Sequence, residues 1–386
     1  MTEITTNLEL SSSEDDTIHF GVCKYKNIMG VTCYMNSILH IMQQLPFFAE
    51  YIAQAKFKDS ILQKIKPDQP VEEAIKKLVI FELFRLFKTS LENDDDSITP
   101  TTFRTMIGTK NDMWTDHIQQ DSQEFFTFLI SVLQEEVGMK CKFIPGGVIS
   151  DTLPVLDPNT SIHNIISVQS LISFQQKEYS PLNNLFDGLI ENNKRCYYCS
   201  SQNYKFEPFI TLGLSVPIKN RFEMTKEFSI YDCFDHLIME EQLDSENKIT
   251  CEFCGLKNRS FNQTMLWKTP KILVIHIKRF MVNQYGICTQ KITNNVVYPF
   301  KNLDLTKYFN PNSPHKSKAN YDLVGINVHQ AMGHGNNVNA GHYTSIVKNI
   351  MNHNWYLYND SQQLEIAQTK KHLQNQNAYM LFYCQV

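Results

Sequence analysis

The first 140 residues carry the hydrophobic spacing of helices. After Cys33, apolar side chains recur at helical intervals as far as Leu45, and Pro46 then stops or kinks the helix that this spacing predicts. Residues 71–89 predict a second amphipathic helix with a stripe of Leu and Phe, and residues 121–137 predict a third. Cys33 is therefore expected at the N-terminus of a helix.

Beyond residue 185 the pattern changes to short runs rich in β-branched and aromatic residues, which favour strands. We expect these runs to form one antiparallel sheet, with strands at residues 206–216, 271–279, 323–328, 342–347, 355–359 and 378–384. Residues 142–180 have scattered Gly, Pro and Ser without a sustained period, which is typical of a long insertion or a mobile connection. Helices followed by strands indicate an α+β fold.

Composition and charge narrow the functional classes. Of the 386 residues, 42% are apolar and only 20% are charged, as in a folded protein with a large core. Residues 1–17 hold five acids and no Lys or Arg and are expected to be a disordered acidic tail, which accounts for the net charge of -4. The sequence has no basic field for nucleic acid and no apolar run of the roughly 20 residues that cross a bilayer. We therefore expect neither a nucleic-acid nor a membrane partner.

Four of the ten cysteines form two C-x-x-C pairs, Cys196 with Cys199 and Cys251 with Cys254. The polar N-terminus has no signal-peptide pattern, so we expect an intracellular location, cytoplasm or nucleus, rather than a disulfide framework. Four thiolates suit a closed, tetrahedral, structural Zn²⁺ site, although 51 residues separate the pairs. Redox pairing within each motif is the alternative interpretation.

The segment Gly30-Val-Thr-Cys-Tyr-Met-Asn-Ser37 places a thiol in the first turn of a helix, where free N–H groups and the helix dipole favour a thiolate. A buried structural cysteine is the alternative. His342 opens one predicted strand and Asn359 closes the next, so the Asn359 amide could accept the imidazole N–H and orient the ring toward Cys33. These residue types predict a cysteine nucleophile with a histidine base.

The sequence resembles the ubiquitin-specific proteases, a papain-like family of cysteine proteases, over roughly residues 20–384. The resemblance rests on the two C-x-x-C pairs and on six further segments in order: Gly30-Val-Thr-Cys-Tyr-Met-Asn-Ser37, Gln119-Gln-Asp-Ser-Gln-Glu-Phe125, His276-Ile-Lys-Arg-Phe280, Ala340-Gly-His-Tyr343, Trp355-Tyr-Leu-Tyr-Asn-Asp360 and Ala378-Tyr-Met-Leu-Phe-Tyr383.

The resemblance implies that Cys33 is the nucleophile, His342 the general base and then acid, and Asn359 the orienting residue, with Asp360 assisting. Members of the family usually carry an Asn or Asp five residues before the nucleophile, which stabilises the oxyanion. That position is Ile28 here, and the nearest amide is Asn27, one residue earlier. Asn27 is then either a donor that reaches the oxyanion through a bulge or a simple turn residue.

Asp121 and Glu124 have the spacing of a helix capping arrangement. The resemblance adds that this acidic helix start faces the basic C-terminal tail of ubiquitin, that His329 and Tyr343 line the groove, and that residues 333–339 form a mobile loop beside it. Charged pairs with the tail would fix the scissile carbonyl near Cys33.

The resemblance implies a papain-like core with a helical thumb (about 20–140), an insertion (141–180), zinc-binding β fingers (185–265) and a β-rich palm (266–386), within a catalytic domain of residues 18–386. It implies hydrolysis of the bond after the C-terminal glycine of ubiquitin, with ubiquitin and ubiquitinated proteins as partners and a regulatory or targeting protein as a further one. The alternatives are a ubiquitin-binding scaffold of the same fold with little turnover and a protease for a ubiquitin-like modifier.

Overall fold

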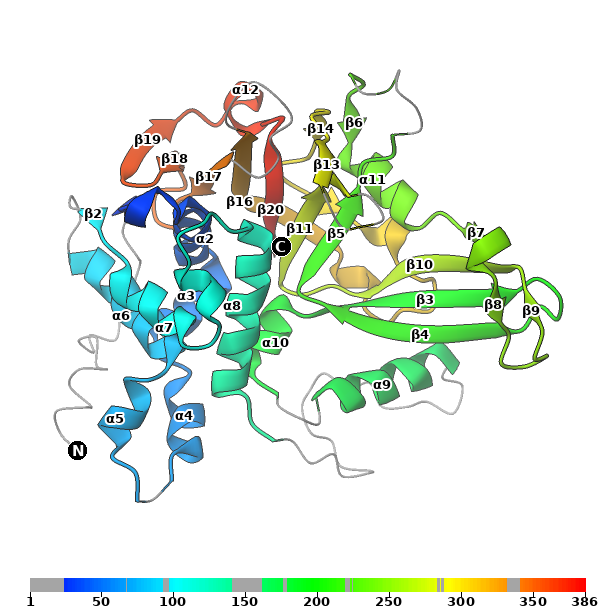
Figure 1. Cartoon of the computed structure of the whole chain (residues 1–386), viewed down its shortest axis with the longest axis horizontal. Helices are drawn as coiled ribbons and strands as arrows, with labels where there is room; N and C mark the ends of the chain where they lie inside the picture. Colours follow the sequence, from blue (N-terminus) through cyan, green and yellow to red (C-terminus); the bar gives the residue numbers. More distant parts are fainter. Residues whose placement is uncertain are drawn as a thin grey trace.

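Helices fill the first part of the chain (Figure 1). The computed structural model describes residues 24–66, 68–92, 97–140, 162–175, 179–218, 223, 225–282, 285, 288–331 and 341–386. Its helices up to residue 140 are α2 (Cys33–Gln43), α3 (Pro46–Ala53), α4 (Lys58–Lys64), α5 (Val71–Ile75), α6 (Val79–Glu92), α7 (Thr101–Gly108) and α8 (Ser122–Val137). The predicted helices after Cys33 and at 121–137 are confirmed, and Pro46 is the first residue of α3.

The prediction of one helix over residues 71–89 is wrong, because the chain turns between α5 and α6. The buried carboxylate of Glu136, on α8, accepts the backbone N–H groups of Val79 and Ile80 at 2.9 Å each. This carboxylate caps the free N–H groups at the start of α6, so a new helix begins there. A cap supplied from a distant part of the chain leaves no local sequence pattern.

The second part of the chain is built on an eight-stranded sheet whose order is β19-β18-β17-β16-β20-β11-β5, with β15 paired to β16. Its strands are β5 (Thr211–Ser215), β11 (Ile272–Lys278), β15 (Leu303–Asp304), β16 (Asn320–Ala331), β17 (Gly341–Lys348), β18 (Trp355–Asn359), β19 (Gln362–Ile366) and β20 (Ala378–Gln385). Alternate residues of the central strands enter two different cores: Phe382 faces the helices, whereas Leu381 faces α11 (Ile230–Leu237) and the loops behind the sheet. Because both faces of the sheet are buried, the sequences of its central strands are nearly continuous apolar runs.

The prediction of one antiparallel sheet is wrong in two respects. β5 pairs with β11 in parallel, so the large sheet is mixed. The predicted strand at 206–216 is broken after Phe209, and its first part is β4 (Gln202–Phe209), which belongs to another sheet. Side-chain alternation identifies a strand but does not show which neighbour it pairs with or in which direction.

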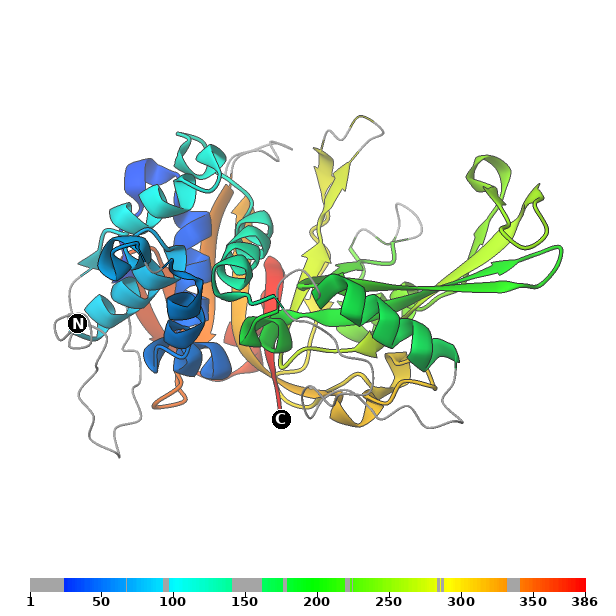
Figure 2. The same cartoon turned by 90° about the horizontal axis from the view of Figure 1, so that it is seen from below.

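A four-stranded sheet, in the order β4-β3-β10-β7, extends away from the helices α2 to α8 (Figure 2). Its other strands are β3 (Gly188–Cys196), β7 (Glu241–Leu243) and β10 (Ser260–Lys268), and the pair β8 (Ile249–Thr250) and β9 (Lys257–Asn258) lies at its far end (Figure 1). Three further two-stranded pairs are β1 (Lys24–Tyr25) with β2 (Ser97–Ile98), β6 (Phe228–Ser229) with β14 (Val296–Val297), and β12 (Phe280–Val282) with β13 (Cys288–Lys291).

The prediction that residues 142–180 lack regular structure is wrong for residues 162–175, which form α9 (Ile162–Gln175), followed by α10 (Pro181–Phe186). α9 packs beside β4, where Ile166 and Leu171 contact the small core of Leu189, Phe206 and Trp267. Residues 141–161, like the predicted tail 1–17 and the predicted loop 333–339, lie outside the described residues. No helix in the part of the chain that the structure describes is long and apolar enough to cross a bilayer. The last helix is α12 (Lys370–Leu373).

α2 is the central helix. Every one of its residues is buried, because it contacts β16 and β17 on one side and α8 on another. The N-terminus of α2, the start of β17 and the start of α8 therefore meet where the helices adjoin the large sheet, and this junction holds the candidate catalytic residues.

Candidate active site

Cys33 is the first residue of α2 and is buried. The preceding loop is held by its own side chains: the Thr32 N–H donates to Asn27 Oδ1 at 2.9 Å, and the Ile28 N–H donates to Thr32 Oγ1 at 2.8 Å. The first N–H groups of a helix have no partner within the helix. The Cys33 side chain thus lies at the positive end of the helix dipole, beside the first N–H groups of α2.

His342 is the second residue of β17, and its Nε2 lies 2.6 Å from Asn359 Oδ1. Asn359 is the last residue of β18, which is hydrogen-bonded to β17, so the sheet fixes the two side chains relative to each other. An amide oxygen only accepts, so Nε2 carries a hydrogen and Nδ1 is the nitrogen that remains for Cys33. The structure brings Cys33, His342 and Asn359 together as the sequence predicts.

The His342 imidazole is held in its charged form. Its hydrogen bond with the Cys33 sulfur, aided by the bond to Asn359, raises the pKa of His342 to about 9, although partial burial opposes the charge. A cysteine thiolate beside an imidazolium is the resting state of an activated thiol nucleophile.

Asp360 joins the Cys33 loop and helix to the sheet. Its Oδ2 accepts from Asn27 Nδ2 at 3.0 Å, and its Oδ1 accepts from Asn36 Nδ2 at 2.8 Å, one turn beyond Cys33 on α2. Oδ2 is also 3.9 Å from His342 Nε2. Asp360 has a φ of 51°, a left-handed conformation that is uncommon outside glycine. The Asp360 carboxylate thus contacts the loop before Cys33 and the helix α2, and it lies close to His342 on the sheet.

The extra residue before Cys33 is taken up in a single 3₁₀ turn over Ile28–Gly30, in which Met29 and Gly30 have φ values of 55° and 73°. The turn directs the Asn27 side chain back to Thr32 and Asp360. Asn27 therefore contributes to this turn, and these contacts are compatible with both interpretations of the residue. The Asn27 side-chain amide has two N–H groups, and the contact with Asp360 uses one of them.

Asp121 is the N-cap of α8, as its spacing predicts. Its Oδ1 accepts the N–H groups of Gln123 at 2.7 Å and Glu124 at 3.1 Å, and its Oδ2 accepts from Tyr379 Oη at 2.5 Å and Tyr343 Oη at 3.5 Å. The Glu124 side chain makes no return bond to the cap among the hydrogen bonds of the described chain, so half of the predicted capping box forms. Partial desolvation and the adjacent Asp121 charge raise the pKa of the Glu124 carboxyl.

His329 and Tyr343 lie side by side on β16 and β17, with ring centroids 4.7 Å apart. Both are buried, and the rings of Phe280 and Tyr379 complete the cluster. Burial, together with the nearby Lys291 charge, lowers the pKa of His329 to about 3, so this imidazole stays neutral. Gly341 is required here, because a Cβ at this position would lie 2.0 Å from His329 Nε2.

Sequence reasoning did not single out three residues that contact this group: Gln119, Lys291 and Tyr379. Lys291 Nζ lies 3.0 Å from His329 Nδ1 and 2.6 Å from the His329 carbonyl oxygen, and burial lowers the pKa of Lys291 to about 8. Gln119 Oε1 accepts the Gly341 N–H at 3.2 Å. Gln119 and Tyr379 belong to segments that carry the family resemblance, whereas the position of Lys291 on the short hairpin β12–β13 has no local signal.

The four cysteines of the two C-x-x-C pairs form one cluster at the far end of the four-stranded sheet, and their sulfur atoms all lie within 4.8 Å of one another. The Cys196 and Cys254 sulfurs are 4.0 Å apart, and those of Cys199 and Cys251 are 3.7 Å apart. Bond lengths of about 2.3 Å to a tetrahedral metal place sulfurs about 3.8 Å apart, whereas a disulfide needs about 2.05 Å. The cluster is in position to bind a metal ion.

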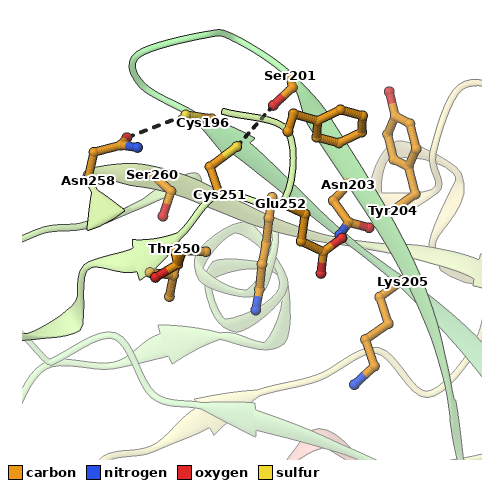
Figure 3. A pocket seen from close by; sticks show the side chains of 13 residues that line it. Cys196, Ser201, Asn203, Tyr204, Lys205, Thr250, Cys251, Glu252, Asn258 and Ser260 are labelled. Carbon is orange, nitrogen blue, oxygen red and sulfur yellow. Dashed lines mark hydrogen bonds between the residues drawn. The ribbon is translucent and has the colours of Figure 1, made fainter. Parts of the chain in front are cut away.

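The surroundings of the cluster lower the pKa of Cys251 and Cys196, whereas burial and the neighbouring thiols raise the pKa of Cys254 to about 11. Ser201 Oγ is 3.4 Å from the Cys251 sulfur, and this contact, with backbone N–H groups, lowers the pKa of Cys251 to about 6 (Figure 3). A cavity of about 360 Å³ opens beside the cluster between β3, β4 and the hairpin β8–β9.

Comparisons with known proteins agree with this geometry. The sequence model of the family described as ubiquitin carboxyl-terminal hydrolase matches residues 23–383. Ubiquitin carboxyl-terminal hydrolase 2 of Gallus gallus is 30% identical over 363 residues, which cover 94% of this chain and 93% of that protein. The protein of the same name from Rattus norvegicus is 28% identical, and the match covers 94% of this chain but only 54% of the rat protein.

Solved structures show the same fold. The yeast SAGA DUBm has a TM-score of 0.67 at 22% identity, covering all of this chain and 72% of that chain. The SAGA Ubp8/Sgf11/Sus1/Sgf73 DUB module bound to ubiquitin aldehyde also scores 0.67, at 21% identity and 73% of that chain. The predicted fold class is thereby confirmed: a papain-like α+β core with a helical thumb, a β-rich palm and β fingers that bear the cysteine cluster. The chain belongs to the ubiquitin carboxyl-terminal hydrolase family, as its resemblance to the ubiquitin-specific proteases predicts.

Proposed function

We propose that the chain is a deubiquitinating thiol isopeptidase, which hydrolyses the bond after the C-terminal glycine of ubiquitin on conjugates or chains. The observation that carries this proposal is the group of Cys33, His342 and Asn359, with His342 Nε2 held by Asn359 and its pKa raised by Cys33. Release of a fluorophore joined to the ubiquitin C-terminus, under reducing conditions, tests it. Folded protein that binds ubiquitin and releases none would instead be a scaffold.

The residues have these proposed roles. The Cys33 thiolate attacks the glycine carbonyl carbon, and the C–S bond forms as the carbonyl oxygen becomes an oxyanion. His342 Nδ1–H then gives its proton to the departing lysine amine as the C–N bond breaks and a thioester remains. Nδ1 next takes a proton from water, whose oxygen attacks the thioester, and the C–S bond breaks to release the ubiquitin carboxylate and the thiolate.

Two N–H donors near the start of α2 would stabilise the oxyanion. The Cys33 backbone N–H is one, and the second amide N–H of Asn27 is the other. Asp360 holds the first N–H at 3.0 Å, which fixes the orientation of the Asn27 amide. A fixed donor stabilises developing charge without reorganisation, and one such donor contributes about 10²–10³-fold in rate.

Asn359→Ala is expected to lower kcat about 10–100-fold, less than His342→Ala, because Asn359 orients the imidazole and transfers no proton. Since its hydrogen bond helps to raise the pKa of His342 to about 9, the alkaline limb of the pH–rate profile should also move to lower pH. Because the pKa of His342 is higher in the folded protein than its ordinary value of 6.5, the charged imidazole stabilises the fold. This contribution to the free energy of unfolding is complete below pH 6.5 and is lost as the pH rises through about 9. Equal losses in the two variants, with an unmoved alkaline limb, would show that Asn359 does not orient the base.

Asp121→Asn is expected to raise KM for ubiquitin substrates about 10–100-fold, because we propose that the carboxylate, with Glu124, pairs with arginines of the ubiquitin tail. Asn is as good an N-cap as Asp, so the thermal midpoint and kcat should change little. Steady-state kinetics test this, with Asp112→Asn, an exposed acid in the preceding turn, as the control. An unchanged KM would leave Asp121 with the capping role alone.

We propose Zn²⁺ as the metal of the cysteine cluster, held by Cys196, Cys199, Cys251 and Cys254. The sulfur–sulfur distances of 3.7 Å and 4.0 Å match those expected around a tetrahedral Zn²⁺ with Zn–S bonds of about 2.3 Å. Four sulfur ligands leave no open position, so the ion would clamp strand ends and take no part in bond cleavage. The clamped sheet would form part of the surface that grips ubiquitin.

A reducing compartment, cytoplasm or nucleus, suits these thiols, and all cysteines whose state is described are free. A regulatory or targeting protein would supply selectivity among conjugates. Ubiquitin is favoured over a ubiquitin-like modifier because the acidic start of α8 suits a basic tail.

A further inference from the structure

One row of β16 side chains faces the helices. Ile326 and Val328 belong to the core behind the sheet, so Gly325, Asn327 and His329 point to the opposite face, where α2 and α8 pack. Asn327 is fully buried, and a buried polar side chain in this position must be hydrogen-bonded to avoid a large cost.

At Gly325 the helix α2 lies directly on the strand. A Cβ at residue 325 would be 2.8 Å from Ile41 Cγ2 and 3.3 Å from Ile41 Cγ1, distances that a β-branched side chain cannot relieve easily. Glycine therefore sets the closest approach of α2 to the sheet.

Asn327 bridges three elements. Its Nδ2 donates to Ser37 Oγ on α2 at 2.8 Å, and its Oδ1 accepts from Ser122 Oγ on α8 at 2.9 Å. All three side chains are buried. The bridge links the helix that begins at Cys33, the helix capped by Asp121, and the strand next to β17.

The polarity of the bridge is fixed. Ser37 Oγ donates its hydrogen to the Tyr34 carbonyl at 3.0 Å, so it must accept from Asn327. The Asn327 amide N–H therefore points to α2 and its oxygen to α8, where Ser122 must donate. Neither Asp nor Leu reproduces this pattern.

The spacing of these contacts sets the register of α2 on the sheet. Ile41 meets Gly325 and Ser37 meets Asn327: four helix residues span about 6 Å and two strand residues about 7 Å. Four residues before Ser37 on α2 is Cys33, and two residues after Asn327 on β16 is His329, so the same spacing places Cys33 level with His329. His329 pairs with Tyr343 on β17, and Tyr343 directly follows His342. A slide of one residue would shift Cys33 by about 1.5 Å and turn it by about 100°.

We propose that Asn327 is a positioning residue, which locks the register of α2 on β16 through Ser37 and Ser122 and so holds Cys33 within reach of His342. The proposal rests on the proposed roles of Cys33 and His342. Misplacement of a reacting group by about 1 Å can cost about 10²-fold in rate, so a register lock affects turnover without touching the substrate.

The test is the triple variant Ser37→Ala, Ser122→Ala, Asn327→Leu, which removes the three polar side chains of the bridge together, so that none of the three loses its partners while remaining in the core. We expect its thermal midpoint and KM to stay near those of the wild type, while kcat falls about 10–100-fold. The pKa of His342, measured by NMR on protein with labelled histidine, should move from about 9 toward 6.5, because Cys33 no longer holds the charge.

Asn349→Ala is the matched control. Asn349 is a buried asparagine whose Oδ1 accepts the backbone N–H groups of Met351 and Asn352 in its own turn, so this change should lower the thermal midpoint and leave kcat and the His342 pKa unchanged. A second test, Gly325→Ala, forces Ile41 away and should reproduce the triple variant. Adding Ile41→Ala should restore kcat, since it removes the clashing atoms.

Wild-type kcat and His342 pKa in the stable triple variant, or in Gly325→Ala, would overturn the register proposal. A wild-type protein without turnover and without a raised His342 pKa would instead contradict the proposed catalytic group.

Discussion

Cys33→Ala is expected to abolish ubiquitin hydrolysis, by about 10⁴-fold or more, and to leave ubiquitin binding intact. The thiolate forms the covalent bond in the proposed mechanism, and no other group at the junction of helices and sheet can replace it. Removal of one buried sulfur leaves the hydrogen bonds of Asn27, Asn36 and Asp360 in place, so the fold should persist. Fluorophore release and ubiquitin affinity, measured on the same protein, test both halves.

Cys233→Ala is the matched control for this change. Cys233 is also buried, but burial raises the pKa of its thiol to about 12, so it is inert as a nucleophile. We expect the Cys233 variant to hydrolyse at close to the wild-type rate. Residual turnover in Cys33→Ala would show that Cys33 is not the nucleophile.

Removal of the metal is expected to be the second large effect. The double variant Cys199→Ser, Cys251→Ser should lose the ion, lower the midpoint of thermal unfolding by about 5–10 °C and weaken ubiquitin binding. The ion would join two segments of the chain that are separated by 51 residues, and among the described strands the hairpin β8–β9 pairs with no strand of the four-stranded sheet. Zinc content per chain and the thermal midpoint are the measurements.

Ser201→Ala serves as the control for metal loss. It removes the hydroxyl beside the Cys251 sulfur but keeps all four ligands, so it should retain one ion per chain with reduced affinity. If the reduced wild-type protein holds no zinc and the double variant keeps the wild-type midpoint, the cluster is not a structural metal site.

The candidate catalytic group was predictable from sequence because each member stands at an end of a regular element. Cys33 begins a helix, His342 begins a strand and Asn359 ends the next, and hydrophobic periodicity locates such ends. Pairing of β17 with β18 then brings His342 and Asn359 together without any further specification.

What escaped prediction depends on contacts between distant residues. The break between α5 and α6 comes from Glu136, more than 50 residues away, and the helix α9 has no clear amphipathic stripe because it covers only a small core. The parallel pairing of β5 with β11 and the position of Lys291 over His329 are likewise set by tertiary packing.

The contacts of Asn27 are the part of the candidate active site that the sequence does not predict. The sequence has an amide one residue from the usual position, and this pattern is compatible with a donor and with a turn residue. The left-handed Met29 and Gly30, which turn the chain so that Asn27 reaches Thr32 and Asp360, are a property of the folded loop. The bond to Asp360 also needs the hairpin β18–β19, which lies more than 300 residues along the chain.

Covalent trapping with modified ubiquitin identifies the nucleophile. Ubiquitin whose C-terminal glycine carries a thiol-reactive electrophile would be mixed with the wild-type protein, and the modified peptide would be located by mass spectrometry. With ten cysteines in the chain, the position of the adduct is informative. We expect one adduct, at Cys33, that is lost in His342→Ala at neutral pH. An adduct at any other cysteine, or none on folded protein that binds ubiquitin, would contradict it.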